Sequence, residues 1–482
     1  MTTKRSWTTY PATYRAKELK SIAGWISSGE SGSVVGLLGS GRSNLLGFLC
    51  QRPEVLRTYL SNQAKPIVVI PIDLNNLPAN TLSALYRVIL RSFYRMRSQF
   101  EQSLQQAATA LYLETRAERD PFLSQSALQE LLLLFQAQQI QVVLVLNRFG
   151  QFGQRASIPM VNTLRGLRDD FKDTLCYIAG MAQEVAYLPD PDTLGDMYEL
   201  LDNYVCWVGA MVEDDARNLI ARAVYAAPVS PSEADMSAML ALSGGYPALL
   251  RSVCHWWLSV ADKPAYPEWV TNLLAERSIQ HRLVEIWEGL TQEEQFVLSE
   301  LQKLQPAATG GAAKNNEGPD AESNNSNKTY DDFCKQNHDT LSRLAVKGVC
   351  RQTRAGWRIM ADLLAAYVAQ VKGRGRGRIW LDEESDEIYQ GQTLLKNLTA
   401  LERSVLSFLI KHPRVRHTKT DLIINTWAKD LRQRGVTDNS LYQVILSLRK
   451  EIEPVPGKQF YLITWRGKPE GGYQFFPEGR PG

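Results

Sequence analysis

Short runs of consecutive apolar residues, separated by stretches with helical periodicity, dominate the first part of the chain. Four of these runs, residues 33–38, 67–72, 141–146 and 175–180, predict buried strands. The stretches that predict helices cover residues 81–118 and 128–138. Strands that are apolar on both faces and alternate with helices are typical of a parallel sheet with helices on both sides. The pattern therefore predicts an α/β domain over residues 1–195.

The strand signals become sparse after residue 196, and helical periodicity replaces them. Helices are expected over residues 212–226, 232–242 and 248–261, with a break at the sequence Ser243-Gly244-Gly245-Tyr246-Pro247. These segments predict a helical domain over residues 196–279. A capped helix, "LTQEEQFVLSELQ", then opens a further domain over residues 280–370. Residues 306–328 within it contain almost no apolar side chains, so we expect a disordered insertion there.

The end of the chain has the clearest pattern. A Gly/Arg-rich segment followed by acidic residues predicts a linker over residues 371–395. In the last domain, residues 396–482, three helical segments precede two short strands around a glycine-rich turn. Three helices and a terminal hairpin predict a winged helix. The third helix has apolar residues at Leu441, Ile445, Leu448 and Ile452, which should face its core.

Length and charge support several domains with a basic end. A chain of 482 residues is too long for a single core. The net charge is only +3, but residues 396–482 hold 15 Lys/Arg against 8 Asp/Glu, a difference of +7. A basic domain on a near-neutral body is a mild nucleic-acid signal. No membrane-length apolar run, secretory leader, CxxC pair or metal-ligand spacing occurs, so a cytoplasmic protein with reduced cysteines and no metal site is expected.

One segment carries candidate chemistry. The sequence "GLLGSGRSN" has the form of a phosphate-binding loop, Gly36-x-x-x-x-Gly41-x-Ser43, with arginine where lysine is usual. Such a loop binds phosphate through main-chain N–H groups and a helix N-terminus. The candidate phosphate-contacting residues are Gly36, Gly39, Ser40, Gly41, Arg42, Ser43 and Asn44.

Several motifs together resemble the signal-transducing P-loop ATPases, the STAND branch of the AAA+ group. They are "YRAKEL" before the loop, "VVLVLNRFGQF", "VGAMVEDDARNLI" and "LSGGYPALLRSV". The resemblance implies a P-loop NTPase core with a helical lid, and a winged helix over residues 280–370. It also implies that Tyr14 and Arg15 lie against a nucleotide base and that Pro247 packs near the adenine. A helix break without a ligand is the alternative reading for Pro247.

The last domain is similar to the DNA-binding domain of OmpR/PhoB-type response regulators. The segments "LTALE", "SLRKEIEP" and "TWRG…GGY" occur in the order of that family. No receiver domain precedes them, so aspartyl phosphorylation is not implied. The fold prediction is thus an α/β P-loop NTPase core with a helical lid, followed by two winged-helix (α+β) domains.

The groups that drive phosphoryl transfer are missing from the expected positions. Asn147 ends the strand at which an aspartate usually holds the metal, and residues 148–151 contain no carboxylate. Asparagine compensates a divalent ion poorly, so the case for Mg²⁺ is weak. Because Arg42, Asn147 and the missing acid affect one chemical centre, we expect ATP or ADP binding without efficient hydrolysis, and no catalytic residue. The alternative is that Arg42 and Asn147 seal an empty cleft.

The third helix of the last domain and its wing supply candidate contacts to double-stranded DNA. These candidates are Asn439, Ser440, Tyr442, Gln443, Ser447, Arg449, Lys450, Thr464, Arg466 and Lys468. This face is polar but barely basic, so contacts to phosphates are better supported than base reading. Docking to protein through Tyr442 and Leu446 is the competing interpretation.

The sequence therefore predicts a DNA-binding regulator or scaffold whose P-loop module binds nucleotide without turning it over. One alternative is an active ATP-dependent switch that oligomerises on DNA. Another is a protein-interaction subunit of a defence or mobile-element complex. Arginines at 87, 91, 95 and 97 suit a neighbouring subunit, nucleic acid or a solvated helix face.

Overall fold

The structure is a computed structural model. It describes residues 7–60, 65–188, 191–225, 227, 229–260, 262–304, 330–354, 356–370, 378–382, 385–391, 393–427, 438–453, 459–467, 470–477 and 479. The predicted insertion at 306–328 and the first part of the predicted linker lie outside these residues. The chain divides into two compact units, and each is described by itself. The first comprises Met1–Gly289, Ala345–Val349 and Met360–Asp362, and the second contains the remainder.

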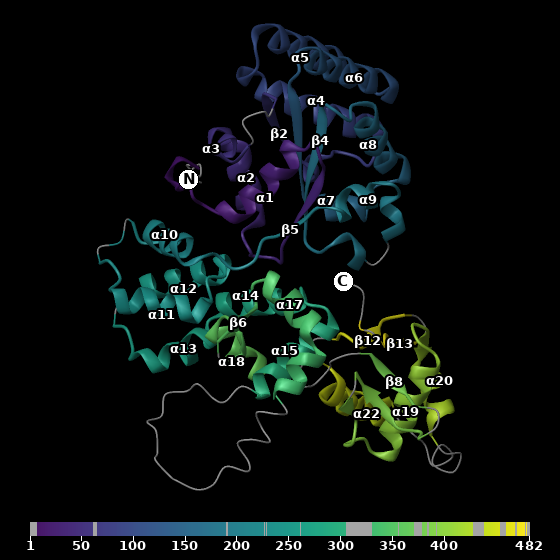
Figure 1. The fold of residues 1–482 in the computed structure, drawn as a ribbon. Helices are drawn as coiled ribbons and strands as arrows, with labels where there is room; N and C mark the ends of the chain where they lie inside the picture. The colour runs from purple at the N-terminus through teal and green to yellow at the C-terminus, as the bar shows by residue number, and fades with distance from the viewer. Residues whose placement is uncertain are drawn as a thin grey trace. The chain divides into compact units, whose positions relative to one another are not determined.

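The first unit contains a five-stranded sheet with the strand order β2-β3-β4-β1-β5, in which every pairing is parallel (Figure 1). Its strands are β1 (Gly32–Val35), β2 (Ile67–Asp73), β3 (Gln141–Asn147), β4 (Leu175–Met181) and β5 (Val205–Trp207). The four predicted strands are confirmed, and β5 was missed because three residues are too short to show a pattern. The register places Asp73 beside Asn147 and Val35 beside Met181.

Helices cover both faces of this sheet. The bounds are α1 (Ala16–Ser27), α2 (Arg42–Gln51), α3 (Pro53–Tyr59), α4 (Leu82–Met96), α5 (Gln102–Thr115), α6 (Pro121–Ala137), α7 (Phe149–Gly153), α8 (Ile158–Asp170) and α9 (Met197–Asp202). Successive residues of β3 point to opposite faces of the sheet. Val143 and Val145 pack with α1–α3, whereas Leu144 and Leu146 pack with α4, α6 and α8. The helix predicted over 81–118 is two helices, because the chain turns at η3 (Arg97–Gln99) and buries Phe100.

Helices continue the first unit after β5. They are α10 (Glu213–Ala223), α11 (Glu233–Ser243), α12 (Pro247–Ser259), α13 (Trp269–Ala275) and α14 (Arg277–Glu288). The three helices predicted between 212 and 261 are therefore confirmed, with ends shifted by a few residues. The chain turns between α11 and α12 because Gly244 and Gly245 have φ of 58° and 74°, a conformation that favours glycine. Pro247 then begins α12 at a position where its missing N–H costs nothing.

The second unit begins with α15 (Gln292–Leu304), α17 (His338–Val346, which ends among the residues of the first unit), β6 (Cys350–Thr353), β7 (Gly356–Ile359) and α18 (Asp362–Gln370). The strands β6 and β7 form an antiparallel pair. The capped helix is confirmed, because Thr291 N–H donates to the Glu294 carboxylate (2.8 Å) and Glu294 N–H donates to the Thr291 hydroxyl (3.3 Å).

The C-terminal domain is a winged helix. It contains β8 (Ile379–Leu381), β9 (Ile388–Gln390), β10 (Thr393–Leu394), α19 (Ala400–Lys411), β11 (Arg416–Thr418), α20 (Lys419–Thr426), α22 (Asp438–Ile452), β12 (Leu462–Trp465) and β13 (Gly472–Phe475). The wing strands β12 and β13 pair antiparallel, and β11 adds to β13. The core prediction is confirmed, since Leu441, Ile445, Leu448 and Ile452 are all fully buried.

The linker prediction is wrong for residues 379–394. These residues form an antiparallel sheet in the order β10-β9-β8. Ile379 and Ile388 are fully buried in the same core as α19 and α22. In the sequence, the acidic composition of residues 382–387 concealed the contribution of these two isoleucines to a core.

Candidate functional sites

The phosphate-loop sequence connects β1 to α2, so its residues lie at the carboxyl edge of the sheet. Gly39 and Gly41 have φ of 83° and 91°, a region that L side chains rarely adopt. A Cβ on Gly39 would also lie 2.7 Å from the Cβ of Ala248. These glycines therefore fix the path of the loop, as the sequence motif predicts.

The main-chain N–H groups of the loop are the first functional feature. Among the described residues, no acceptor is found for the N–H groups of Gly39, Gly41, Arg42 and Ser43. The last three stand at the N-terminus of α2, where a helix favours an anion. The buried Ser40 hydroxyl, fully shielded from solvent, also has no partner. The loop thus retains the donors that would hold a phosphate group.

The Arg42 side chain turns back across the carboxyl edge of the sheet. Its Nη1 donates to the carbonyl of Gly36 (3.2 Å) and to the carbonyl of Met181, at the end of β4. Burial, with a smaller contribution from the nearby Arg148 charge, lowers the pKa of Arg42 to about 10. The guanidinium remains charged at neutral pH, and its Nε has no partner. A cation therefore lies at the base of the loop and retains an unused donor.

The corner at which a metal would bind lacks suitable ligands. Asn147 lies at the end of β3, and its buried Oδ1 has no hydrogen-bond partner. The next residue, Arg148, adopts a left-handed conformation (φ 61°) and is exposed. Ser43, the other expected ligand, is exposed. Two arginines and an amide do not fit Mg²⁺, which requires anionic oxygen ligands. Among the described residues, no group of three His, Cys, Asp or Glu side chains could hold a metal ion.

One carboxylate near this corner was missed by sequence reasoning. Asp73 ends β2 directly beside Asn147 and has the same strand parity, so both side chains lie on the α2 face. Its Oδ1 accepts from Asn75 N–H (3.1 Å), which caps the following turn. The end of the second predicted strand was the available signal, because the carboxyl ends of parallel strands meet at one edge. The Glu184 carboxylate, which follows β4, accepts from the Trp207 indole N–H.

Tyr14 and Arg15 are held within the protein. Tyr14 is buried between Tyr10 and Phe48, with ring centroids 4.8 and 5.3 Å away. The Arg15 guanidinium donates to the carbonyls of Ser40 (2.8 Å) and Gly209 (2.9 Å). Arg15 is only 2% exposed, so it supports the phosphate loop from the interior of the protein. A contact of either residue with a nucleotide base stays a prediction.

The Gly-Gly-Tyr-Pro turn packs directly on the loop. The Tyr246 hydroxyl donates to the Leu38 carbonyl (2.9 Å), and Ala248 N–H donates to the Gly39 carbonyl (3.1 Å). A Cβ on Gly41 would lie 3.3 Å from Pro247 Cγ. The structure therefore brings Pro247 to the phosphate loop and adds Tyr246, which was not singled out, whereas packing of Pro247 near an adenine stays a prediction. These contacts use carbonyl groups and leave the N–H groups of the loop unpaired.

In the C-terminal domain, α22 exposes part of the predicted interface. Asn439, Ser440, Tyr442, Gln443 and Lys450 are exposed, and so are Thr464 and Arg466 in the wing. Tyr442 is 50% exposed and the neighbouring Leu446 is 37% exposed. Lys468 lies outside the described residues.

Several of the predicted contact residues, Arg449, Thr464 and Ser447 among them, have partners inside the domain. The Arg449 guanidinium donates to the Leu462 carbonyl (3.1 and 2.7 Å) and to the Thr464 hydroxyl (2.8 Å). Ser447 forms a hydrogen bond with Glu402. Arg449 therefore joins α22 to the wing, and a role in contacting DNA is a prediction only for the exposed members of the set.

Glu453 is a structural residue that sequence reasoning missed. Its carboxylate, only 2% exposed, accepts from the N–H groups of Phe460 (2.8 Å), Tyr461 (3.0 Å) and Leu462 (3.0 Å). Burial raises the pKa of this carboxyl group. A lone acidic residue at the end of an amphipathic helix carried no signal for this role.

Comparison with known proteins gives one family match. Residues 392–475 match the family described as "Transcriptional regulatory protein, C terminal". Together with the winged-helix geometry, this match confirms the predicted OmpR/PhoB-type domain at the end of the chain. No curated protein matches the sequence.

Solved structures give only weak likenesses to the longer part of the chain. The ORC2 protein of Aeropyrum pernix in ADPNP-ADP complexes is 13% identical, covers 74% of this chain and 94% of its own, and has a TM-score of 0.37. The Walker-type ATPase PABY2304 of Pyrococcus abyssi is 16% identical, with 74% and 98% covered and a TM-score of 0.40. The CDC6p protein of Pyrobaculum aerophilum is 14% identical, with 76% and 95% covered and a TM-score of 0.35. At these TM-scores we take nothing about function from them.

The fold and the loop define the class of protein. A parallel sheet in the order β2-β3-β4-β1-β5, with the loop between β1 and α2, has the arrangement of a P-loop α/β module. The same chain carries a DNA-binding domain of the transcriptional-regulator type. Among the described residues, no helix combines the length and apolar content needed to cross a membrane.

Proposed function

We propose that the chain is a DNA-binding regulator or scaffold whose P-loop module holds ATP or ADP without hydrolysing it efficiently. Unpaired N–H groups at Gly39, Gly41, Arg42 and Ser43 carry this proposal, because main chain supplies most of the phosphate contacts in such loops. Helices α10–α13 then act as the lid, and α15 to α18 form a mainly structural first winged helix.

The proposal includes nucleotide binding that does not depend on magnesium. Arg42 and Arg148 place two cations at the metal corner, where other P-loop proteins place a carboxylate. These arginines would neutralise phosphate charge that a metal otherwise balances, and they would repel a divalent cation. Mg²⁺ polarises the phosphoryl group and neutralises its developing charge when present. Asp73, the carboxylate near this corner, caps the turn after β2, so the site can bind and orient a nucleotide but has, among the described residues, no carboxylate placed to activate a water molecule.

One experiment tests the nucleotide part. ATP and ADP affinities of the full chain are measured by calorimetry in EDTA and in Mg²⁺, and phosphate release is measured on the same sample with and without duplex DNA. Similar affinities in both buffers with no phosphate release support the proposal. Magnesium-dependent release that disappears in Ser43→Ala would favour an active ATP switch. The absence of nucleotide binding in either buffer would indicate a sealed cleft.

DNA binding is proposed for the exposed faces of α22 and the wing. Gln443 can pair with an adenine edge, while Lys450 and Arg466 suit phosphates. The test is fluorescence anisotropy of the full chain with duplex DNA over a range of salt concentrations, because phosphate contacts weaken steeply with salt. Arg466→Gln is expected to weaken binding to all sequences and to reduce the salt dependence.

One observation favours protein docking as the second candidate for this face. Tyr442 and Leu446 are exposed side by side on α22, and such residues suit a protein interface. If Tyr442→Ala and Leu446→Ala leave salt-dependent DNA binding unchanged and Arg466→Gln also has no effect, the docking function is the better reading.

A further inference from the structure

Helix α4 carries a row of arginines, of which Arg95 is exposed and Arg87 and Arg91 are half-buried. Arg87, Arg91 and Arg95 follow one another at four-residue intervals, so they form one stripe about 12 Å long at a rise of about 1.5 Å per residue. The opposite face carries Leu85, Ile89 and Phe93, which are fully buried against the sheet. The stripe therefore points away from the core, and Arg97 in η3 extends it.

Arg91 and Arg95 of this row have no partner in the part of the chain that the structure describes, unlike the arginines on α8 and α10. The guanidinium groups of Arg91 and Arg95 make no hydrogen bond or ion pair with any described residue. By contrast, Arg165 on α8 pairs with Asp169 (2.9 Å), and Arg217 on α10 pairs with Glu213 (2.8 Å). Like charges at four-residue spacing destabilise a helix by about 0.2–0.5 kcal/mol per pair. In this row the repulsion between the arginines is not offset by any described acidic side chain. Such a charge pattern is typical of a surface that binds an anion.

The flanking arginines are oriented by the protein. Arg87 donates to the carbonyls of Ser83 and Arg116 (both 3.2 Å), so it joins α4 to the end of α5. The Arg97 guanidinium lies 3.9 Å from the Tyr94 ring centroid, and Tyr94 stacks on Tyr112 at 4.6 Å. Between residues 82 and 116, five arginines face two glutamates, Glu101 and Glu114. The cations are thus partly preorganised, which limits the entropy lost on binding.

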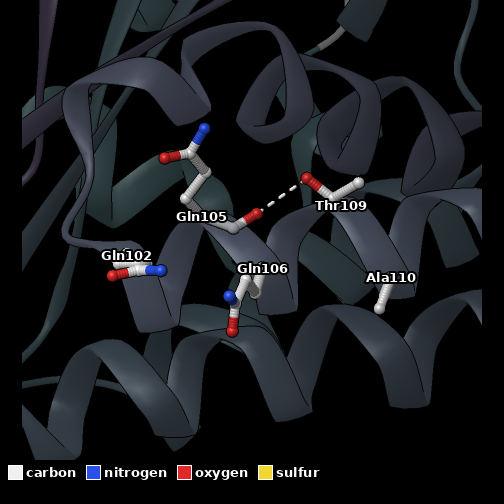
Figure 2. A pocket seen from close by; sticks show the side chains of 5 residues that line it. All are labelled: Gln102, Gln105, Gln106, Thr109 and Ala110. Atoms are coloured by element: carbon white, nitrogen blue, oxygen red, sulfur yellow. Dashed lines mark hydrogen bonds between the residues drawn. The ribbon is translucent and has the colours of Figure 1, made fainter.

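A polar hollow lies on α5, the helix that packs against α4. Figure 2 shows its lining residues, which are Gln102, Gln105, Gln106, Thr109 and Ala110. The hollow has a volume of about 450 Å³. Helix α5 packs against α4, and Gln105 and Thr109 share a helix face with Tyr112, the residue that stacks on Tyr94. None of the five is charged. Glutamine amides and threonine hydroxyls, like arginine, commonly contact phosphate and sugar oxygens without reading sequence.

We propose that the exposed face of α4 and α5 is a second nucleic-acid surface, which binds the sugar–phosphate backbone of double-stranded DNA irrespective of sequence. The two free cations Arg91 and Arg95, the uncharged donors on α5 and the absence of acidic residues on α4 are complementary to a continuous polyanion. The surface lies on the P-loop module and does not involve the phosphate loop, so it is independent of nucleotide binding. With the C-terminal domain it would provide two DNA contacts in one chain and raise the overall avidity.

The test compares two full-length double variants of equal charge. Arg91→Gln/Arg95→Gln removes the free cations of the stripe, and Arg57→Gln/Arg277→Gln removes two exposed arginines from α3 and α14. Anisotropy with a labelled duplex of arbitrary sequence is recorded over a range of salt. The stripe variant is expected to make the slope of log K against log salt less steep by about 1.8, from about 0.9 per phosphate contact. The control variant should change the slope much less.

Further experiments separate DNA binding by this surface from DNA binding by other parts of the chain. In an Arg466→Gln background, the stripe variant should cause the same additional change, because the two sites are far apart in sequence and independent. A slope for the stripe variant equal to that of the control would overturn the proposal. So would an unchanged DNA slope combined with loss of binding to anionic lipid vesicles or to an acidic polypeptide, because the row would then serve another partner.

Discussion

Replacing Arg42 with alanine distinguishes a residue that holds phosphate from a residue that plugs the loop. The guanidinium donates to the Gly36 and Met181 carbonyls, while its Nε has no partner and the N–H groups of the loop remain unpaired. If Arg42 contributes a cation to a bound phosphate, alanine weakens nucleotide binding. If it only seals the cleft, alanine opens the cleft and strengthens binding. The sign of the change therefore separates the two roles.

The geometry favours a loss of affinity. The side chain leaves the loop N–H groups free, so it does not compete with phosphate for them. A hydrogen bond to a charged group contributes about 1.5–3 kcal/mol, which corresponds to a fall in affinity of roughly 10- to 150-fold. Loss of the two bonds to carbonyls should also destabilise the folded module by about 1–3 kcal/mol. Arg42→Lys keeps the charge and should lose less affinity than alanine.

The assay is calorimetric titration of the full chain with ADP in EDTA, with thermal unfolding as a check that each variant is folded. Arg148→Gln should also weaken ADP binding, because the Arg148 charge should help to neutralise the phosphates. Arg148 lies close enough to Arg42 to lower the pKa of Arg42. Equal or higher affinity in a folded Arg42→Ala protein would refute the phosphate-holding role and favour a plugged cleft.

Three predictions concern the stability of the C-terminal domain. Each is checked by urea unfolding of the full chain, with the fluorescence of that domain as the signal. Glu453→Gln should destabilise the domain by about 1–3 kcal/mol. Both carboxylate oxygens of Glu453 accept from backbone N–H groups, and an amide would turn its own N–H group toward some of these donors. An unchanged urea midpoint of unfolding would contradict this prediction. Gly472→Ala should disrupt the wing, because a Cβ there would lie 1.9 Å from the His417 carbonyl; wild-type DNA affinity would count against it. Burial lowers the pKa of His417, so the unfolded chain takes up the proton first and stability should fall as the pH drops below about 6.5. His417→Phe should flatten that dependence.

The sequence predicted the parts of the fold that repeat a pattern over enough residues. Four of the five strands in the first sheet are continuous apolar runs, and the core positions of α22 recur with helical spacing. It did not predict β5, whose three residues take their structure from pairing with β1. It also misjudged residues 379–394, where two buried isoleucines outweigh an acidic composition. Short edge strands depend on tertiary contacts that no local window contains.

For the candidate site, the sequence identified the loop but not how its side chains are used. The glycines and the substitution at Arg42 were visible in the motif. The return of Arg42 to the end of β4 joins residues 139 positions apart. The same holds for Arg15, which bonds across 25 positions to Ser40 and 194 to Gly209. The motifs located these arginines in the sequence. Only the structure shows that Arg15 holds the phosphate loop to the segment after β5.

The connections around Arg15 suggest how occupancy of the loop could act without turnover. Arg15 ties the Ser40 carbonyl of the loop to the Gly209 carbonyl that follows β5, and its own N–H donates to Asp215 of α10 (3.0 Å). The same segment after β5 continues to Met211, whose N–H donates to Gly245 in the turn that rests on the loop (2.9 Å). A ligand that prefers one arrangement of these contacts shifts the population by its difference in affinity, and no bond needs to break. Under the proposed function, the module therefore needs no chemical energy from hydrolysis, because binding alone can change the contacts that Arg15 makes between the loop, the segment after β5 and α10.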